Sequence, residues 1–322
     1  MKKQTKIWLV TAACLVLVGA ILFSVAMTSL KWDFNKFGNR VFVTNVYTFS
    51  ADSFVDIAVE SDESMLYFYP SENDECKIVC YEVENLLHTV EVVNGKLTIR
   101  RNDTRELIDF LSFGGGNPEI KIYLPEREYG SLLIRKTTGD TTITNDFWFE
   151  NMEIIHSTGD VICNASVTDR LKIHSTTGDI RVENVYAKSL DLSVSTGHIT
   201  ATSVTCQSNV GVKVSTGKAV ITNLSCENFD SEGNTGDISL TNVVATRNMS
   251  VERSTGDIFF DGCDAAEVEI ETDTGDVKGT FLTEKVIFAE TDTGDIDVPV
   301  LLNGGRCEIS TNTGDVKISI KE

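Results

Sequence analysis

The sequence predicts an all-β protein, a parallel β-solenoid of about ten coils with a β-rich N-terminal cap, preceded by one transmembrane helix. The tripeptide Thr-Gly-Asp, or a close variant, returns ten times at intervals of 19 or 20 residues. Alternating apolar positions flank each copy, and a long apolar stretch lies near the N-terminus. A period this short and regular is typical of a chain that stacks one unit on itself.

The N-terminal apolar stretch runs from Ile7 to Met27 behind three lysines. Its 21 residues are enough to cross a bilayer once. Ser24 and Ala26 offer small residues for cleavage after Ala26, but the stretch is longer than the core of a usual signal peptide, which favours an uncleaved anchor. The lysines favour a cytoplasmic N-terminus, so we expect a single-pass membrane protein with an extracytoplasmic C-terminal domain.

The chain is acidic, with 28 Lys and Arg against 48 Asp and Glu and a formal net charge of −20. Such a field disfavours binding to nucleic acid or to anionic lipid. It permits cations or basic surfaces as partners, and it also serves solubility alone.

The segment between the anchor and the repeats reads as β structure. Val92 and Val93 run into Asn94-Gly95, the strongest short-range hairpin signal in the chain. The region is expected to cover the first coil, which otherwise exposes its apolar interior and unpaired backbone. The expected strands are 54–59, 65–69, 77–81, 89–93, 96–100 and 120–124, with a helical pattern at 104–113. We therefore expect a stub and anchor at 1–30, a linker at 31–40, the cap region at 41–130 and the solenoid at 131–322.

Each repeat encodes two short strands around its glycine. Apolar residues stand two and four positions after the glycine, and again seven and five positions before it. This period of two is typical of strands with one buried face. Glycine supplies the positive φ of the turn between them, and aspartate caps neighbouring amides. The turn glycines are Gly139, Gly159, Gly178, Gly197, Gly217, Gly236, Gly256, Gly275, Gly294 and Gly314.

The residue after the glycine is acidic in eight repeats, so stacking in register predicts a row of carboxylates about 5 Å apart. A bound Ca²⁺ would relieve their repulsion, and the last three coils have the most oxygens. The alternative, which we favour, is that each aspartate only caps its turn while water screens its charge. His198 and Lys218 interrupt the row, as ordinary repeat drift at exposed corners explains. The candidate calcium ligands are Asp257, Asp273, Asp276, Asp292, Asp295 and Asp315.

Two pairs of cysteines are informative. Cys163 and Cys307 fall on the buried phase of the repeat and are expected to act as small apolar groups. Cys206 and Cys226 each lie nine residues after their glycine, so they are predicted to be vertical neighbours at a distance compatible with a disulfide.

A lysine-led span, a β-rich stretch ending in Ile-Lys-Ile-Tyr-Leu-Pro (Ile120 to Pro125) and serial Ser/Thr-Thr-Gly-Asp turns occur together here. This combination resembles the bacterial "putative adhesin" family, domain of unknown function 4097, from about residue 41 to the end. The resemblance implies a Gram-positive type of cell-envelope protein with a β-solenoid domain, and no established catalytic activity or ligand.

We expect a non-catalytic, membrane-anchored surface protein that binds an envelope protein or glycan, or serves as a scaffold. One alternative is an envelope-stress sensor or scaffold that binds a membrane partner, because no cap follows Ile320 and the last coil is left open or covered by a partner. The other is a carbohydrate-active β-helix enzyme, which needs a groove built from long inserted loops. The period varies by one residue, and none of the four histidines sits in a catalytic motif.

Overall fold

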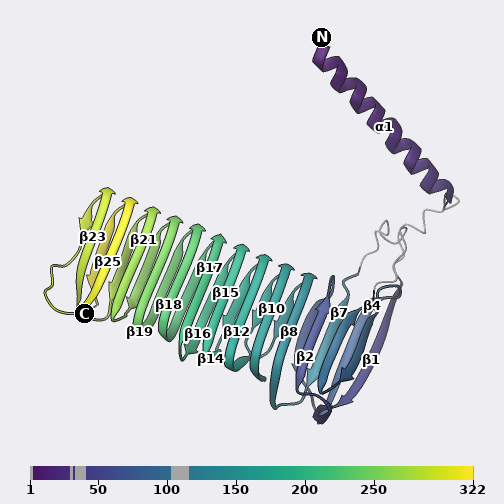
Figure 1. Ribbon diagram of the computed structural model, residues 1–322, viewed down its shortest axis with the longest axis horizontal. Coiled ribbons are helices and arrows are strands. Elements are labelled where there is room, and N and C mark those ends of the chain that lie inside the picture. Colours follow the sequence, from purple (N-terminus) through teal and green to yellow (C-terminus); the bar gives the residue numbers. More distant parts are fainter. Residues whose placement is uncertain (1–2, 30–31, 33–40, 103–115, 322) are drawn as a thin grey trace.

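The computed structural model describes residues 3–29, 32, 41–102 and 116–321 (Figure 1). It shows one long helix and a rod of stacked β coils. The predicted helical pattern at 104–113 and most of the predicted linker at 31–40 lie outside the described residues.

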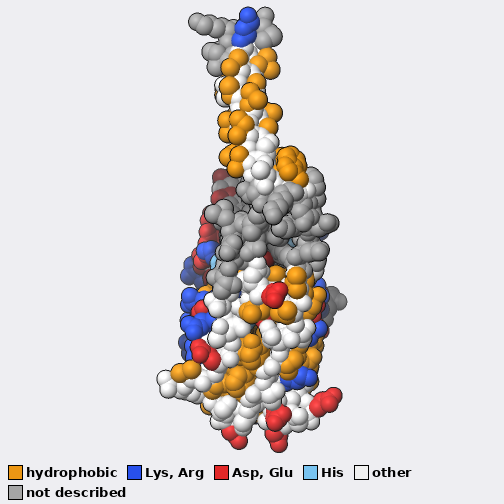
Figure 2. Space-filling model, turned by 90° about the vertical axis from the view of Figure 1, so that its right-hand side faces the viewer, with side chains coloured by type: hydrophobic (Ala, Val, Ile, Leu, Met, Phe, Trp, Pro, Cys, Tyr) orange, Lys and Arg blue, Asp and Glu red, His pale blue; other side chains and the backbone are white. Residues whose placement is uncertain are grey.

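The helix α1 (Lys3–Ser29) contains the predicted apolar stretch. Within it, Trp8–Thr28 is long and apolar enough to cross a membrane, and none of this window is buried against the rest of the chain. Hydrophobic side chains cover the helix along its length (Figure 2). This pattern fits either a membrane anchor or a signal sequence.

The rod has two walls, each a row of hydrogen-bonded strands, and the chain alternates between them. In spatial order the first wall contains β5 (His88–Val93), β6 (Lys96–Arg101), β2 (Asp56–Ser61), β8 (Glu128–Thr138), β10 (Trp148–Thr158), β12 (Ser166–Thr177), β15 (Ser189–Thr196), β17 (Asn209–Thr216), the later halves of β18 (Ala219–Thr235) and β19 (Ile238–Thr255), β21 (Glu267–Thr274), β25 (Gly305–Thr313) and β23 (Lys285–Thr293).

The second wall contains β1 (Phe42–Ser50), β4 (Glu75–Val83), β7 (Glu119–Leu124), β3 (Met65–Pro70), β9 (Thr141–Ile143), β11 (Val161–Cys163), β13 (Ile180–Glu183) with β14 (Tyr186–Ala187), β16 (Ile199–Cys206), the first halves of β18 and β19, β20 (Ile258–Cys263), β22 (Val277–Phe281), β26 (Val316–Ile320) and β24 (Ile296–Asp297). A short 3-10 turn, η2 (Ala51–Ser53), joins β1 to β2.

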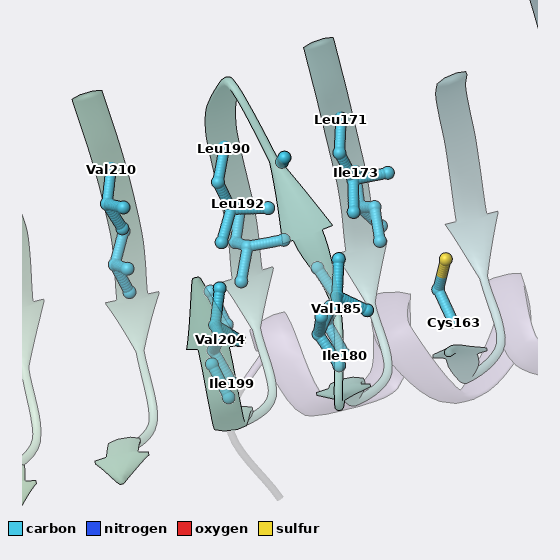
Figure 3. Close-up of a cluster of buried hydrophobic side chains, with 14 of the residues drawn as sticks. Cys163, Leu171, Ile173, Ile180, Val185, Leu190, Leu192, Ile199, Val204 and Val210 are labelled. Atoms are coloured by element: carbon cyan, nitrogen blue, oxygen red, sulfur yellow. The ribbon is translucent and has the colours of Figure 1, made fainter. Parts of the chain in front are cut away.

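Stacking in register confirms the parallel β-solenoid. From β8 to β23 every pairing between coils is parallel, and the two predicted inner positions of each strand are buried in most coils. Figure 3 shows the resulting interior, which Ile173 and Leu192 fill from one wall and Ile180 and Ile199 fill from the other. Since no coil can bury its apolar face alone, this continuous interior is what makes the stack stable.

Four of the coils have a second bend at a left-handed non-glycine residue, which the sequence pattern did not predict. It falls six residues after the glycine, where Asn184, Ser203, Asn223 and Asn242 have φ between 52° and 55°. Before this left-handed residue, the side chains two and four positions after the glycine face the core. Beyond it, the side chains seven and nine positions after the glycine face the core, and they are buried as well. The prediction of two strands per repeat was therefore incomplete.

The N-terminal region extends the stack before closing it. Strands β2 and β3 form a coil that pairs in parallel with β8 and β9, and β6 and β7 form another beyond it. Antiparallel strands β5, β4 and β1 then close this end. The predicted hairpin at Asn94-Gly95 is confirmed, with both residues at positive φ between β5 and β6.

The other end departs from chain order, which corrects the expectation that the final coil is the open one. The coil of β25 and β26 lies between the coil of β21 and β22 and the coil of β23 and β24 (Figure 1). The open coil is therefore β23–β24. Pro299 gives a physical reason, because proline lacks the N–H that an internal rung must donate and is tolerated at an edge. It is the one proline in segment 131–322.

Candidate functional site

The turn aspartates form a hydrogen-bonded row with one break, here called the aspartate ladder. In each pair the carboxylate oxygen Oδ1 of one aspartate accepts the backbone N–H at the same position of the next coil, at 2.8 to 3.3 Å. Carboxylates that accept backbone bonds cap the turns, which is the reading favoured from the sequence. The ladder comprises Asp140, Asp160, Asp179, Asp237, Asp257, Asp276, Asp315 and Asp295, in spatial order and with a break before Asp237.

His198 and Lys218, which replace aspartate in two coils, remove negative charge from the ladder at those positions. Lys218 Nζ donates to the Asp237 carboxylate at 2.7 Å, and this bond holds the pKa of Asp237 below its usual range. His198 Nδ1 lies 3.2 Å from the Asp179 carboxylate. Lys218 thus relieves the repulsion along the ridge, and His198 removes one carboxylate from it.

The interposed coil also changes the predicted calcium set. Asp273 and Asp292 are not in adjacent coils, because Asn312 lies between their positions and its amide donates to Asp273 at 3.1 Å. Across the described part of the chain, no three His, Cys, Asp or Glu side chains converge as metal ligands. Calcium binding at this corner stays a prediction that the geometry does not favour.

The cysteines occupy the places that the period assigned. Cys163 and Cys307 are fully buried. Cys206 and Cys226 follow directly on the paired residues Thr205 and Ser225, so they are vertical neighbours as predicted. Both thiols are free in this structure, so the disulfide is not formed here, and burial raises the pKa of Cys226 to about 12.

A buried polar column was missed by the sequence reasoning. It lies three residues before the turn glycine and includes Lys136, His156, Ser175 and Arg253, with Val194 and Val214 at the same position in two coils between them. Lys136 Nζ donates to the Asp140 carbonyl at 2.6 Å, and Thr141 Oγ1 lies 3.0 Å from His156 Nε2. Burial lowers the pKa of Lys136 to about 7, and burial together with the Lys136 charge lowers the pKa of His156 to about 3.

This column predicts an acid-sensitive fold. Because the folded-state pKa of His156 is depressed, its contribution to stability is lost as the pH falls from 6.5 towards 3. Replacing His156 with serine, the residue that the next coil has in this column, should flatten that loss by at most about 1.4 kcal/mol per pH unit. Urea unfolding of both proteins between pH 7 and pH 4 measures the difference, and parallel curves would contradict it.

A second buried network lies in the cap and has the bonding order of a catalytic triad. His88 Nδ1 is 2.7 Å from Glu82 Oε2, and His88 Nε2 is 3.1 Å from Ser61 Oγ. The pocket beside His88 is partly open to solvent and has a volume of about 20 Å³, room for about one water molecule, whereas Ser61 also lines a larger pocket of about 570 Å³. Glu82 also accepts the His88 backbone N–H at 2.7 Å, so the network clamps the β4–β5 loop.

The open terminal coil has an unpaired edge and exposed apolar side chains. On the side away from β25 and β26, β23 and β24 pair with no other described strand. The inward residues Ile287 and Ala289 are half-buried, where their counterparts in β25 are buried. Exposed fractions reach 91% for Val300 and 89% for Leu302 in the loop that follows.

The fold and these surfaces define a β-solenoid repeat protein in which the most exposed apolar side chains of the rod lie at its open end. The family model named Toastrack DUF4097 matches residues 54–213 and 207–322, so this chain belongs to that family. No curated protein matches the chain.

Several solved structures are similar to this chain at low sequence identity. A protein from Parabacteroides distasonis named "putative adhesin" is 14% identical, with a TM-score of 0.50, and the match covers 84% of this chain and 98% of that one. A "putative adhesin" from Parabacteroides merdae is also 14% identical, with a TM-score of 0.44 over 86% and 97% of the two chains. A "putative lipid binding protein" from Parabacteroides distasonis is 18% identical, with a TM-score of 0.42 over 75% and 95%.

Proposed function

We propose that this protein is a non-catalytic, membrane-anchored envelope protein whose extracytoplasmic solenoid binds a protein partner at the open coil β23–β24. The unpaired edge of this coil carries the proposal. Edge strands are templates for pairing with another strand, and most proteins blunt them with charge, proline or a covering segment. Here Pro299 lies after β24, but Ile287 and Ala289 on β23 and Ile296 on β24 stay partly exposed.

Strand addition is the binding mode that this edge supports. Backbone hydrogen bonds to β23 would supply affinity, and the apolar positions at the end of the core would select an alternating apolar strand. The names of the similar structures support surface binding over catalysis. The two clusters of polar side chains described above, the aspartate ladder and the cap network, already form hydrogen bonds within the chain.

A site-specific photo-crosslinking experiment tests this function. A benzophenone amino acid replaces Phe288 on β23 in full-length protein made in intact cells, and the matched control replaces Phe259 on β20. The two phenylalanines are 55% and 48% exposed, but only Phe288 lies at the open end. We expect an adduct from position 288 and none from 259. Equal adducts, or none from 288, would contradict the proposed function.

A further inference from the structure

The open coil has two features that a second copy of this chain would satisfy together. Its backbone edge is free along β23, and the loop 298–304 returns the chain from the Gly294 corner to the opposite corner where β25 begins (Figure 1). This loop carries Val300 and Leu302, the two most exposed large apolar side chains of the molecule's described part. An occupant must therefore pair with a strand on one wall and cover an apolar loop on the other.

We propose that two copies of this protein join head to head through their open coils, as a dimer with two-fold symmetry. This inference rests on the proposed function and names its partner. A two-fold axis perpendicular to the walls pairs β23 with its own symmetry mate in antiparallel direction and keeps the inner faces of both copies on the same side. The core then continues from one molecule into the other.

The axis also exchanges the corners of the coil. The loop 298–304 of one copy therefore faces the region of β24 in its partner, where Ile296 is 45% exposed. Apolar side chains that are exposed in one copy thus meet apolar side chains of the other.

Charge distinguishes this arrangement from simple continuation of the stack. A further coil added in parallel would place its acidic corner on Asp295, as each coil of the ladder does within the chain. The two-fold arrangement instead puts the acidic ridges of the two copies on opposite sides of the junction, so like charges are kept apart. Because a two-fold junction uses the open coil of both copies, it joins two molecules and leaves neither open coil for a further copy.

The position of the anchor relative to the open coil determines which surfaces the dimer connects. The anchor precedes β1, which is the outermost strand of the second wall at the cap end. The open coil is the far end of the same rod, so head-to-head pairing places the two membrane helices at opposite ends of the dimer. The pairing therefore joins two membrane surfaces, which is adhesion between like molecules.

Vesicle clustering and adduct mass together test this inference. Full-length protein is reconstituted into liposomes, and clustering is followed by light scattering. We expect the double variant V300K/L302K to reduce the scattering increase by about tenfold or more, because both copies bring the two new charges into the junction. The matched control is Val220→Lys, an exposed apolar residue midway along the rod, which should cluster vesicles like the wild type. Because Val300 and Leu302 are almost fully exposed, their replacement spares the fold.

The Phe288 photo-adduct separates this inference from the proposed function. An adduct of twice the chain mass supports the dimer. An adduct of another mass leaves the proposed function standing and overturns the dimer, and the absence of any adduct overturns both. Vesicles that stay dispersed, or that still cluster with V300K/L302K, also overturn the dimer.

Discussion

Replacing Gly217 with alanine is expected to lower the free energy of unfolding by about 3 kcal/mol or more. Gly217 has φ 135°, which L side chains rarely adopt, and a Cβ built there would lie 1.9 Å from the carbonyl oxygen of Gly197 in the adjacent coil. The clash is with backbone, so it is relieved only by separating two coils. That separation would weaken the parallel hydrogen bonds on both sides of the corner.

The matched control is Gly211→Ala, six residues earlier in the same coil. Gly211 lies in β17, and a Cβ there meets no atom within 4 Å. Alanine reduces the freedom of the unfolded chain, so this variant should be as stable as the wild type or more stable by about 0.5 kcal/mol. Urea unfolding of the full chain in detergent compares the two. Similar losses for both variants would show that stacking at the corner does not require glycine.

The corner that makes Gly217 sensitive is also what made the fold predictable. One glycine per 19 or 20 residues fixes the ridge, and the alternation on either side fixes which residues face the core. The polar column three residues before the glycine continues the same alternation. Two coils have the apolar residues Val194 and Val214 at this position, which indicates that the position faces the core. Lys136, His156 and Arg253 obscured that signal, because ionisable side chains are seldom fully buried without a charged partner.

The repeat period could not predict the spatial order of the last two coils. The coils of Gly294 and Gly314 carry the same corner motif, so spacing alone cannot rank them. In the structure the coil with Pro299 lies at the edge. The coil with Cys307 and Ile309, which are both buried, lies inside the stack. The cap network of Ser61, Glu82 and His88 was missed for another reason: its members come from three strands or loops whose pairing is not encoded in any repeat.

Replacing Asp264 with alanine is expected to cost about 3–5 kcal/mol, with the loss concentrated in the open coil. Lys285 begins β23 and is 2% exposed. Its ammonium group contacts the Asp264 carboxylate and the Thr283 hydroxyl. Without Asp264 the buried ammonium has no counter-ion, and the least costly response is for β23 to detach and hydrate it. Hydrogen exchange should therefore accelerate in residues 285–297 before the rest of the rod.

Two further variants separate the buried pair from general charge effects. The double change Asp264→Leu with Lys285→Met should recover most of the stability, because removing both charges leaves nothing unpaired. Asp237→Ala breaks the exposed pair with Lys218 and should cost no more than about 1 kcal/mol. If Asp264→Ala left exchange in β23 unchanged, the pair would not hold the open coil. If exchange rises as expected, the Phe288 photo-adduct should weaken with it, because a frayed β23 no longer presents an edge that a second strand can join.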